Sequence, residues 1–262
     1  MSIDLRVKHD LESRRRAVEL FDAGVGCKPA AEALSVPRET VREWQWVYRA
    51  FGSEALLSMG GKQSRYTFEQ RVAAASAVVD GGMAKTDAMA EFGIRSKSPL
   101  ERWCKLGTDV TEFKVAGAKA YWAPVLDFCT KEIVASDIST SPDLAQQHRM
   151  LDRLLEALPD GAAPTMHSDM GWQYQHESYT SRLEGAGITQ SMSRKGNCID
   201  NAATEQLFGH VKDELYRGRE WGSFEDFKRD LEEYIVHWNT RRRQVRLKGL
   251  TPEEFRNRAL AA

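Results

Sequence analysis

Three acidic residues stand where their carboxylates could meet: Asp109, Asp169 and Glu205. Asp109 lies within a predicted strand, Asp169 directly follows a later strand, and Glu205 lies in the early turns of a predicted helix. Carboxylate oxygens suit Mg²⁺, which keeps several waters and needs few protein ligands. Two such ions roughly 3.5–4 Å apart can activate a water or a 3′-hydroxyl and stabilise the leaving oxygen of a phosphodiester. Brought together by the fold, these three acids are candidates for a site of that kind.

A lysine shares the predicted helix face of Glu205. Thirty-five residues separate Asp169 from Glu205, and Lys212 follows Glu205 by seven positions. Seven residues make nearly two helical turns, so both side chains lie on one face, where the lysine could bind a phosphate. Asp127 and Asp137 are alternatives for the first acid, but the pattern favours a turn for Asp127 and a strand surface for Asp137.

Other residues near the acids allow both a functional and a structural interpretation. The basic run from Ser193 to Asn197, which contains Arg194 and Lys195, predicts either contact with a DNA backbone or an ordinary loop. Trp172 and Tyr174 could stack on an unpaired base, although a local hydrophobic cluster is favoured. His167 could bind a metal, although packing is favoured.

A dense basic segment stands near the C-terminus. Five positive charges fall within eight residues: Arg241, Arg242, Arg243, Arg246 and Lys248. A solvated tail is the structural alternative, but this density favours contact with phosphates.

The elements that must position the acids begin at residue 106. Turn signals and apolar patterning predict strands over 106–115, 120–126, 132–138, 164–168 and 188–192. Helices are predicted from a cap at Ser141 and Pro142 to residue 158, over 177–184, from residue 200 or 201 to 216, and over 224–239. A basic stretch and a short helix follow. This order is that of the ribonuclease-H-like fold, an α/β core with a mixed five-stranded sheet flanked by helices.

The first 105 residues read as two all-α helix-turn-helix units. Predicted helices over 11–23, 29–34 and 38–51 are followed by a second set over 66–80, 85–92 and 98–105, with Trp103 in the role of Trp44. In this motif the N-terminal residues of the last helix reach base edges, here Arg38, Thr40 and Arg42. A generic three-helix bundle is the alternative. The predicted domains are 1–57, a linker over 58–65, 66–105 and the catalytic core with its basic C-terminal segment over 106–262.

Composition is that of an ordinary globular protein. Of the 262 residues, 42% are hydrophobic and 29% charged, and the net charge is −1. Residues 106–190 hold 6 basic and 12 acidic residues, whereas the flanking segments are slightly basic, as suits a metal site beside DNA contacts. No stretch approaches the roughly 20 apolar residues that span a bilayer, and the four cysteines lack metal-ligand spacing. We expect a cytoplasmic, nucleoid-associated protein without a membrane partner.

Motifs along the second half of the chain appear in a fixed order. They read TDVTEF, YWAPVLDFCTKEIVAS, HSDMGWQYQ, SMSRKGNCIDNAATEQLFGHVKDEL and YIVHWNTRRRQVRLKGLTPEEF. In order and spacing these segments resemble bacterial insertion-sequence transposases of the third insertion-sequence family, the DDE type with a retroviral-integrase-like core. Residues 11–105 resemble the tandem helix-turn-helix unit of that family's first reading frame.

The resemblance implies a DNA transposase that performs strand cleavage and strand transfer in DNA integration and recombination. It implies Asp109, Asp169 and Glu205 as ligands of two Mg²⁺ ions, for which Mn²⁺ can substitute. The implied partners are double-stranded DNA, as terminal inverted repeats and target DNA, and further copies of the chain assembled on that DNA.

One part of the family pattern is missing. Family members usually carry a leucine-zipper helix and a further helical region before the core, whereas here Trp103 stands almost directly before Asp109. This gap predicts weak pairing of subunits. The alternative function is therefore a catalytically impaired, internally deleted remnant that acts as a DNA-binding repressor. A ribonuclease-H-like nuclease is disfavoured, because it needs no tandem reading units.

Overall fold

The computed structural model describes residues 11–57, 66–193 and 202–260. The chain forms two compact units, one of Met1–Ala74 with Met83–Glu101 and one of Ala75–Gly82 with Arg102–Ala262. Arg194 and Lys195, and the expected cap at residue 200 or 201, lie outside the described residues. The domain boundaries drawn from the sequence stay a prediction.

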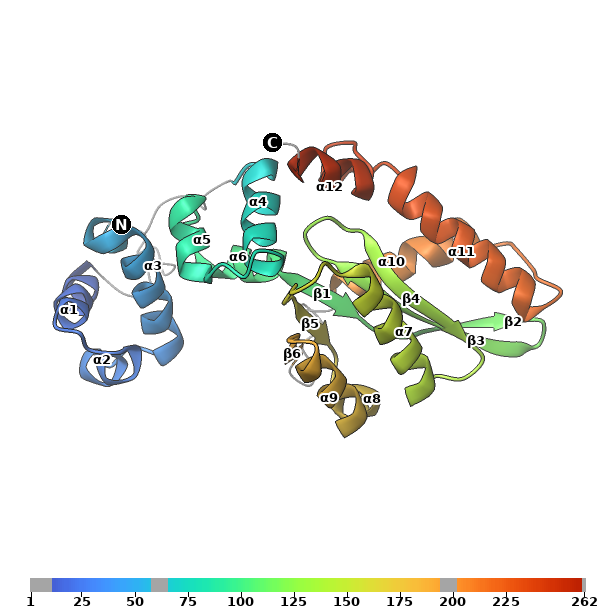
Figure 1. The fold of residues 1–262 in the computed structure, drawn as a ribbon, viewed down its shortest axis with the longest axis horizontal. Helices are drawn as coiled ribbons and strands as arrows, with labels where there is room; N and C mark the ends of the chain where they lie inside the picture. The colour runs from blue at the N-terminus through green and yellow to red at the C-terminus, as the bar shows by residue number, and fades with distance from the viewer. Residues whose placement is uncertain (1–10, 58–65, 194–201, 261–262) are drawn as a thin grey trace, which may run out of the picture. The chain divides into compact units, whose positions relative to one another are not determined.

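The first helical set is a compact trio. It contains α1 (Leu11–Asp22), α2 (Cys27–Leu34) and α3 (Arg38–Leu57) (Figure 1). Ala17, Phe21, Ala30, Val41 and Trp44 are buried among them. The helix predicted over 38–51 ends close to a kink, because Gly52 has a φ of 79° and the chain then continues helically to residue 57.

The second set repeats the turn of the first. It contains α4 (Phe68–Val79), α5 (Lys85–Glu91) and α6 (Lys97–Trp103). Ser35 after α2 and Gly93 after α5 both have positive φ, 52° and 65°. The next residues, Val36 and Ile94, are buried, and each donates its N–H to the carbonyl five residues earlier, at 3.2 and 2.8 Å. This shared turn supports the predicted internal repeat.

A mixed sheet of six strands forms the core of the second unit. The strands are β1 (Lys105–Thr108), β2 (Thr111–Val115), β3 (Ala118–Asp127), β4 (Ile133–Ser139), β5 (Thr165–Ser168) and β6 (Thr189–Met192). Their order is β2-β3-β1-β5-β6, with β4 also paired to β3. β1 pairs with β5, and β5 with β6, in parallel, whereas the pairs that involve β3 are antiparallel.

The prediction of five strands was wrong, because the first predicted strand is broken. β1 and β2 lie along the same edge of β3 in one register, with Thr108 opposite Val125 and Thr111 opposite Trp122. At the break, Asp109 Oδ1 accepts the N–H of Val110 at 2.7 Å. A side chain that binds its neighbouring N–H competes with the strand ladder, and the interruption falls at the first of the three acids.

Helices cover both faces of this sheet (Figure 1). α7 (Leu144–Ala157), α8 (Trp172–Gln175) and α9 (Glu177–Gly185) enclose one hydrophobic cluster with β1, β3 and β5. α10 (Ala202–Val211), the π-helix Lys212–Tyr216 and α11 (Phe224–Thr240) enclose the other with β2, β3 and β4. A short 3-10 turn (Val245–Leu247) and α12 (Pro252–Leu260) complete the chain. The core is therefore three-layered, as the sequence predicts. None of the described helices is long and apolar enough to cross a membrane.

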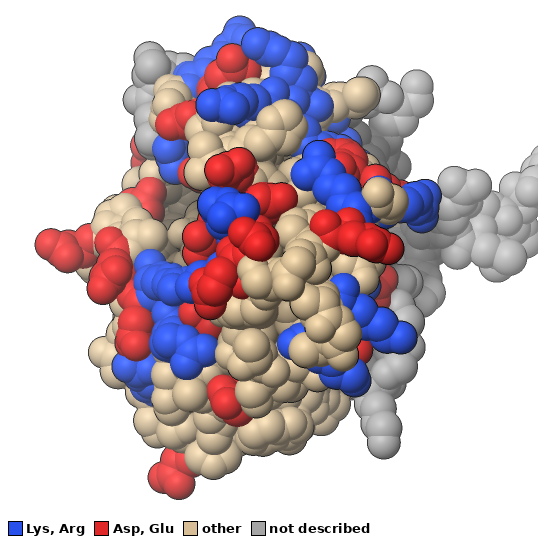
Figure 2. Space-filling view, turned by 90° about the vertical axis from the view of Figure 1, so that its right-hand side faces the viewer, with Lys and Arg blue, Asp and Glu red and all other residues tan. Residues whose placement is uncertain are grey.

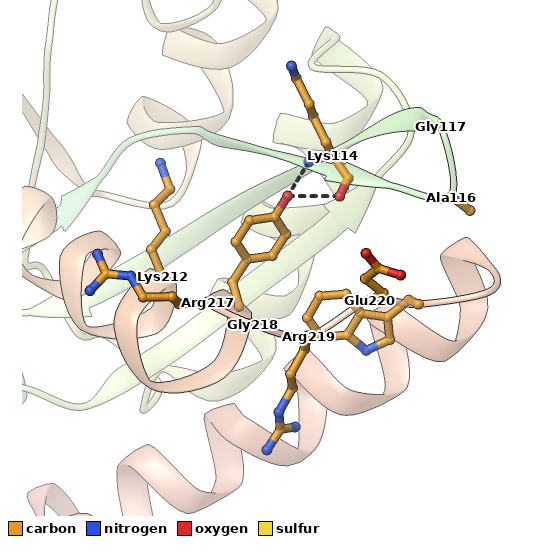
Figure 3. Close-up of a pocket in the computed structure, with 10 residues that line it drawn as sticks. Lys114, Ala116, Gly117, Lys212, Arg217, Gly218, Arg219 and Glu220 are labelled. Atoms are coloured by element: carbon orange, nitrogen blue, oxygen red, sulfur yellow. Dashed lines mark hydrogen bonds between the residues drawn. The ribbon is translucent and has the colours of Figure 1, made fainter.

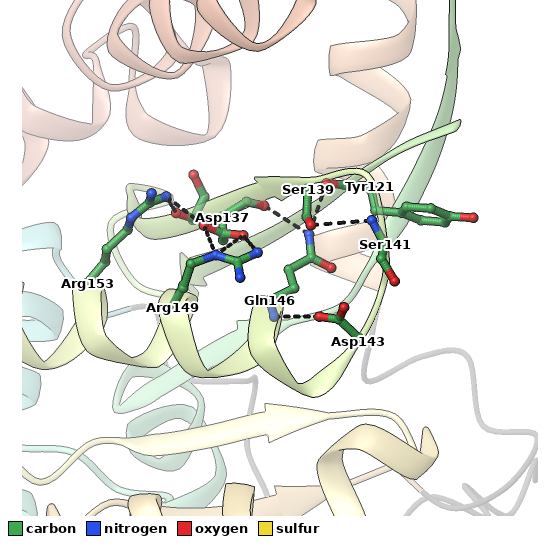
Figure 4. Close-up of polar contacts among 9 residues, drawn as sticks. Tyr121, Asp137, Ser139, Ser141, Asp143, Gln146, Arg149 and Arg153 are labelled. Atoms are coloured by element: carbon green, nitrogen blue, oxygen red, sulfur yellow. Dashed lines mark hydrogen bonds and ion pairs between the residues drawn. The ribbon is translucent and has the colours of Figure 1, made fainter. Parts of the chain in front are cut away.

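The cap of α7 corrects one expectation. Asp143, and not Ser141, is the N-cap, and its carboxylate accepts the N–H of Gln146 at 2.9 Å (Figure 4). An aspartate at this position also places negative charge at the positive end of the helix. Ser141 instead donates its own N–H to Ser139 Oγ at 3.3 Å, within the turn that leads to the helix.

Candidate active site

Two of the three acids follow adjacent parallel strands. Gly107 of β1 pairs with His167 of β5, and the same register continued by two residues sets Asp109 beside Asp169. Each aspartate is fixed by its own Oδ1, which accepts the N–H of Val110 at 2.7 Å or of Gly171 at 2.8 Å. The two carboxylates thus share one edge of the sheet, with one oxygen of each held by the backbone.

Glu205 reaches this edge because α10 lies close to β1. A Cβ built on Gly107 would lie 2.2 Å from a ring carbon of Phe128 and 3.2 Å from Thr204 Oγ1. Thr204 is buried and directly precedes Glu205, which is exposed. Only glycine leaves room for this approach. Our sequence analysis missed Gly107, although a glycine inside a predicted strand is itself a signal of close backbone approach.

The three carboxylates repel one another. The pKa of the half-buried Asp109 is raised to about 6, first by burial and further by the negative charges of Asp169 and Glu205, while the Val110 N–H acts in the opposite direction. A carboxyl group whose neighbours are like charges resists ionisation. A cation among these oxygens would relieve that repulsion.

The donor set fits a hard divalent cation. All three side chains offer carboxylate oxygen, the ligand that Mg²⁺ prefers, and both aspartates are oriented by backbone N–H groups. Within residues 11–57, 66–193 and 202–260, no three His, Cys, Asp or Glu side chains stand close enough together to hold an ion. Two of the acids, Asp109 and Asp169, are held by backbone N–H groups, whereas the Glu205 side chain is exposed.

The two alternative aspartates have structural partners. Asp127 Oδ1 accepts the N–H groups of Cys129 and Thr130, at 2.6 and 3.3 Å, and so shapes the turn after β3. Asp137 is buried on β4 and pairs with Arg149 and Arg153 of α7, at 2.9 and 3.2 Å (Figure 4). Both aspartates therefore stabilise the fold through these contacts.

The neighbouring aromatic and histidine residues divide between core and surface. Tyr174 is buried and meets Tyr179 edge to face at 5.5 Å, which confirms a hydrophobic cluster for this residue. His167 is also buried, and its Nδ1 and Nε2 lie 3.1 and 3.3 Å from the hydroxyls of Ser191 and Ser193. Trp172, by contrast, is 60% exposed directly after the Asp169 turn.

The predicted DNA-contacting residues lie in separate places. Arg38, Thr40 and Arg42 lie in the first turns of α3, and Arg42 pairs with Glu39. Lys212 is exposed at the start of the π-helix, with its Nζ 5.8 Å from the centre of the Phe113 ring. Positive and negative side chains alternate over the face in Figure 2, so the overall charge does not mark a binding surface there.

The basic segment after α11 is only partly available to a ligand. Arg242 pairs with Glu214 at 2.5 Å and lies over the ring of Trp238, 4.5 Å from its centre. Arg243 donates to the carbonyl of Gly249 at 2.9 Å and remains 65% exposed. Arg241, at the C-cap of α11, is exposed. Arg242 therefore has a structural task whatever else it does.

Family models define the class of this core. Two models, both described as an integrase core domain, match residues 97–198 and 205–260. The fold is similar to that of a chain in the structure of the simian T-cell lymphotropic virus intasome in complex with PP2A regulatory subunit B56 gamma, with a TM-score of 0.51. That match has 14% identity and covers 67% of this chain and 68% of the other. The predicted ribonuclease-H-like fold is confirmed.

Relatives found by sequence similarity define the family more narrowly than the core domain does. The chain is 42% identical over 174 residues to an uncharacterized transposase-like protein of Haemophilus influenzae, covering 66% of this chain and 79% of the relative. It is 42% identical to the putative transposase InsK of insertion sequence IS150 of Escherichia coli, over 62% of this chain and 56% of the relative. It is 30% identical to the transposase InsF of insertion sequence IS3A of Escherichia coli, over 69% of this chain and 62% of the relative.

The chain belongs to the bacterial insertion-sequence transposases with an integrase-like core. It spans less than two thirds of the InsK and InsF proteins that it matches. Membership of this family confirms the resemblance drawn from the motifs and does not favour the repressor alternative.

Proposed function

We propose that this protein is a DNA transposase that cleaves DNA strands at the ends of its element and joins them to target DNA. Asp109, Asp169 and Glu205 would hold two Mg²⁺ ions, for which Mn²⁺ can substitute. The observation that carries the proposal is geometric: Asp109 and Asp169 follow the adjacent parallel strands β1 and β5, each with its Oδ1 held by a backbone N–H, at the place where α10 packs closely on Gly107.

The chain itself orients the three acids and supplies their negative charge. The backbone N–H groups of Val110 and Gly171 orient Asp109 and Asp169, and the close approach of α10 at Gly107 brings Glu205 to them. When bound, two divalent ions activate the attacking oxygen and stabilise the leaving oxygen of a phosphodiester.

DNA would be held by two sets of residues. In the N-terminal unit, Arg38, Thr40 and Arg42 would read bases of the terminal inverted repeats from the start of α3. In the core, Lys212, Arg241 and Arg243 would contact the phosphate backbone. Arg194, Lys195 and Arg242 belong to the same prediction. Pairing of two element ends would bring two or more copies of the chain together on DNA, at the nucleoid in the cytoplasm.

Strand cleavage tests this function. A duplex that carries the element end, taken from the inverted repeats that flank the gene, is incubated with the full chain and Mg²⁺ or Mn²⁺. Asp169→Asn removes one charge from the three acids and is expected to abolish cleavage while the protein still binds the duplex. Asp160→Asn makes the same change at an exposed turn residue and should cleave as the wild type does. Equal cleavage by the wild type and Asp169→Asn would reject the assignment.

A further inference from the structure

A buried histidine lies two residues before Asp169, on the strand that Asp169 follows. His167 of β5 is 2% exposed. Its Nδ1 lies 3.1 Å from the Ser191 hydroxyl, and its Nε2 lies 3.3 Å from the Ser193 hydroxyl. Ser191 belongs to β6, and Ser193 directly follows that strand. One ring therefore joins β5 to its neighbour through two side chains, in addition to the backbone ladder.

The hydrogen bonds of Ser193 indicate which nitrogen of His167 carries the proton. Ser193 donates its hydroxyl hydrogen to the carbonyl of Ser168 at 3.4 Å and its N–H to the same carbonyl at 3.0 Å. A hydroxyl has a single hydrogen, so its oxygen accepts from Nε2–H of the ring, and Nδ1 then accepts from the Ser191 hydroxyl. With both nitrogens bonded to serines, His167 holds its neighbours in place and is not directed at a metal ion.

The strand that His167 binds is short and lies at the edge of the sheet. The order β2-β3-β1-β5-β6 places β6 at the end, and its four residues are exposed or half-buried. Such a strand opens readily, because few buried contacts protect its hydrogen bonds. The last backbone pair between β5 and β6 joins Ser168 to Met192. The two bonds of His167 therefore reinforce the pairing where it ends, next to Asp169.

The other two acids are held by different contacts. β1, which precedes Asp109, lies inside the sheet between β3 and β5. The π-helix that continues the helix of Glu205 is joined to β2, because the Tyr216 hydroxyl donates to the carbonyl of Lys114 at 2.9 Å and accepts its N–H at 3.2 Å (Figure 3). Asp169 is thus the acid whose strand depends on the edge of the sheet.

His167 also lies on the face of the sheet that α10 covers. Gly107 of β1 pairs with His167, and side chains at paired positions of neighbouring strands point to the same face. A Cβ on Gly107 would lie 3.2 Å from Thr204 Oγ1, which identifies this face as that of α10. The ring of His167 is therefore on the side of the sheet from which Glu205 approaches the two aspartates.

We propose that His167 is a positioning residue for the reaction. Through Ser191 and Ser193 it holds the end of β5, and so keeps Asp169 at the spacing from Asp109 that binding of divalent ions requires. The inference rests on the proposed function, because that function assigns the metal ions to these acids. A histidine that only packed in the core could be replaced by leucine with no effect beyond stability.

The test replaces the ring by an apolar side chain and by an amide. His167→Leu keeps a similar volume but removes both hydrogen bonds, whereas His167→Gln keeps a side chain that donates and accepts. His148→Leu is the matched control, since His148 of α7 also lies 3.1 Å from a serine hydroxyl, that of Ser178 on α9, between two helices that carry none of the acids. Each variant of the full chain is measured for urea unfolding, for Mn²⁺ binding by electron paramagnetic resonance, and for kcat and KM of cleavage of the element-end duplex.

His167→Leu is expected to bind Mn²⁺ about 10-fold more weakly and to cleave with a kcat about 10- to 100-fold lower, because losing a group that orients metal ligands has effects of this size. Its KM for the duplex should stay that of the wild type. His167→Gln should recover much of both losses. His148→Leu should change only the midpoint of urea unfolding.

Ser193→Ala tests the same contact with a smaller change. If His167 acts through Ser193, the loss of Mn²⁺ affinity in the double variant should be less than the product of the two single losses, because both changes remove one shared contact. Independent losses would contradict this coupling. Where His167→Leu does not fold, Ser193→Ala carries the test, and an unchanged Mn²⁺ affinity in that variant would overturn the proposal.

Wild-type Mn²⁺ affinity and kcat in a folded His167→Leu, or equal losses in His148→Leu, would also overturn the positioning role. In either case, loss of cleavage in Asp169→Asn would leave the proposed function standing. A wild-type chain that neither binds Mn²⁺ nor cleaves the duplex would reject both.

Discussion

Gly107 is the residue on which the position of Glu205 depends. In Gly107→Ala the new methyl group would overlap the Phe128 ring and press on Thr204, the residue before Glu205. We expect a loss of about 1–3 kcal/mol in the free energy of unfolding, measured by urea denaturation, because overpacking forces neighbours to move. The rate of strand cleavage should fall by more than the loss of folded protein explains, because α10 moves away from the aspartates. Gly209→Ala, where a Cβ meets nothing within 4 Å, should instead stabilise α10 by up to about 1 kcal/mol.

Asp137 shows how a buried acid can be structural. Its carboxylate is 2% exposed and is neutralised by Arg149 and Arg153, which are each 46% exposed. The double change Arg149→Ala with Arg153→Ala would leave a buried charge without partners, at a cost of about 3 kcal/mol in thermal or urea unfolding. Adding Asp137→Asn to that variant should recover part of the loss. No recovery would mean that packing by the arginine stems, and not charge, is what the pair contributes.

At the scale of elements, one ion pair joins the π-helix to the segment after α11. Arg242 lowers the pKa of Glu214, assisted by the Tyr234 hydroxyl, while burial opposes the shift. A lowered carboxyl pKa stabilises the fold above the ordinary value of 4.5, and the contribution is lost as the pH falls through the lowered value. Glu214→Gln should therefore cost about 1 kcal/mol at pH 7, a modest figure because Glu214 is partly exposed. The stabilities of variant and wild type should converge in acid.

Glu233→Gln on the exposed face of α11 is the control for this pair, and its stability should follow that of the wild type at every pH. A constant gap between Glu214→Gln and the wild type down to low pH would contradict the ionic explanation. Arg242→Ala should resemble Glu214→Gln in stability. That outcome would separate the structural task of Arg242 from any contact with DNA.

The sequence predicted most elements of the core, because strand and helix periodicities are local. It did not predict what depends on single contacts. The strand over 106–115 is broken because the Asp109 carboxylate takes the Val110 N–H, and the cap of α7 falls on Asp143. The π-helix over 212–216 coincides with the bond between Tyr216 and Lys114, 102 residues away in sequence. No local pattern contains such a partner.

At the scale of the whole molecule, the sequence predicts which residues form the candidate site, but it does not contain the geometry of that site. Acids spaced along the chain, with Lys212 after the last, are visible as a motif. The approach of α10 to β1 at Gly107 and the shared edge of β1 and β5 arise only from the packed sheet.

The division of the chain into two compact units predicts that the N-terminal unit recognises DNA sequence and that the core carries out strand cleavage. Arg38→Ala, at the start of α3, removes a proposed base contact and should cost about 1–3 kcal/mol on the element-end duplex but little on a scrambled duplex. Arg241→Ala, in the core, removes a proposed phosphate contact and should weaken both duplexes equally, with the salt slope reduced by about 1. Arg49→Ala, exposed further along α3, is the control for Arg38. Fluorescence anisotropy on the two duplexes distinguishes these outcomes. If Arg38→Ala weakened binding to both duplexes alike, Arg38 would contact the phosphate backbone of the DNA. The residues that recognise the base sequence would then lie elsewhere in the chain.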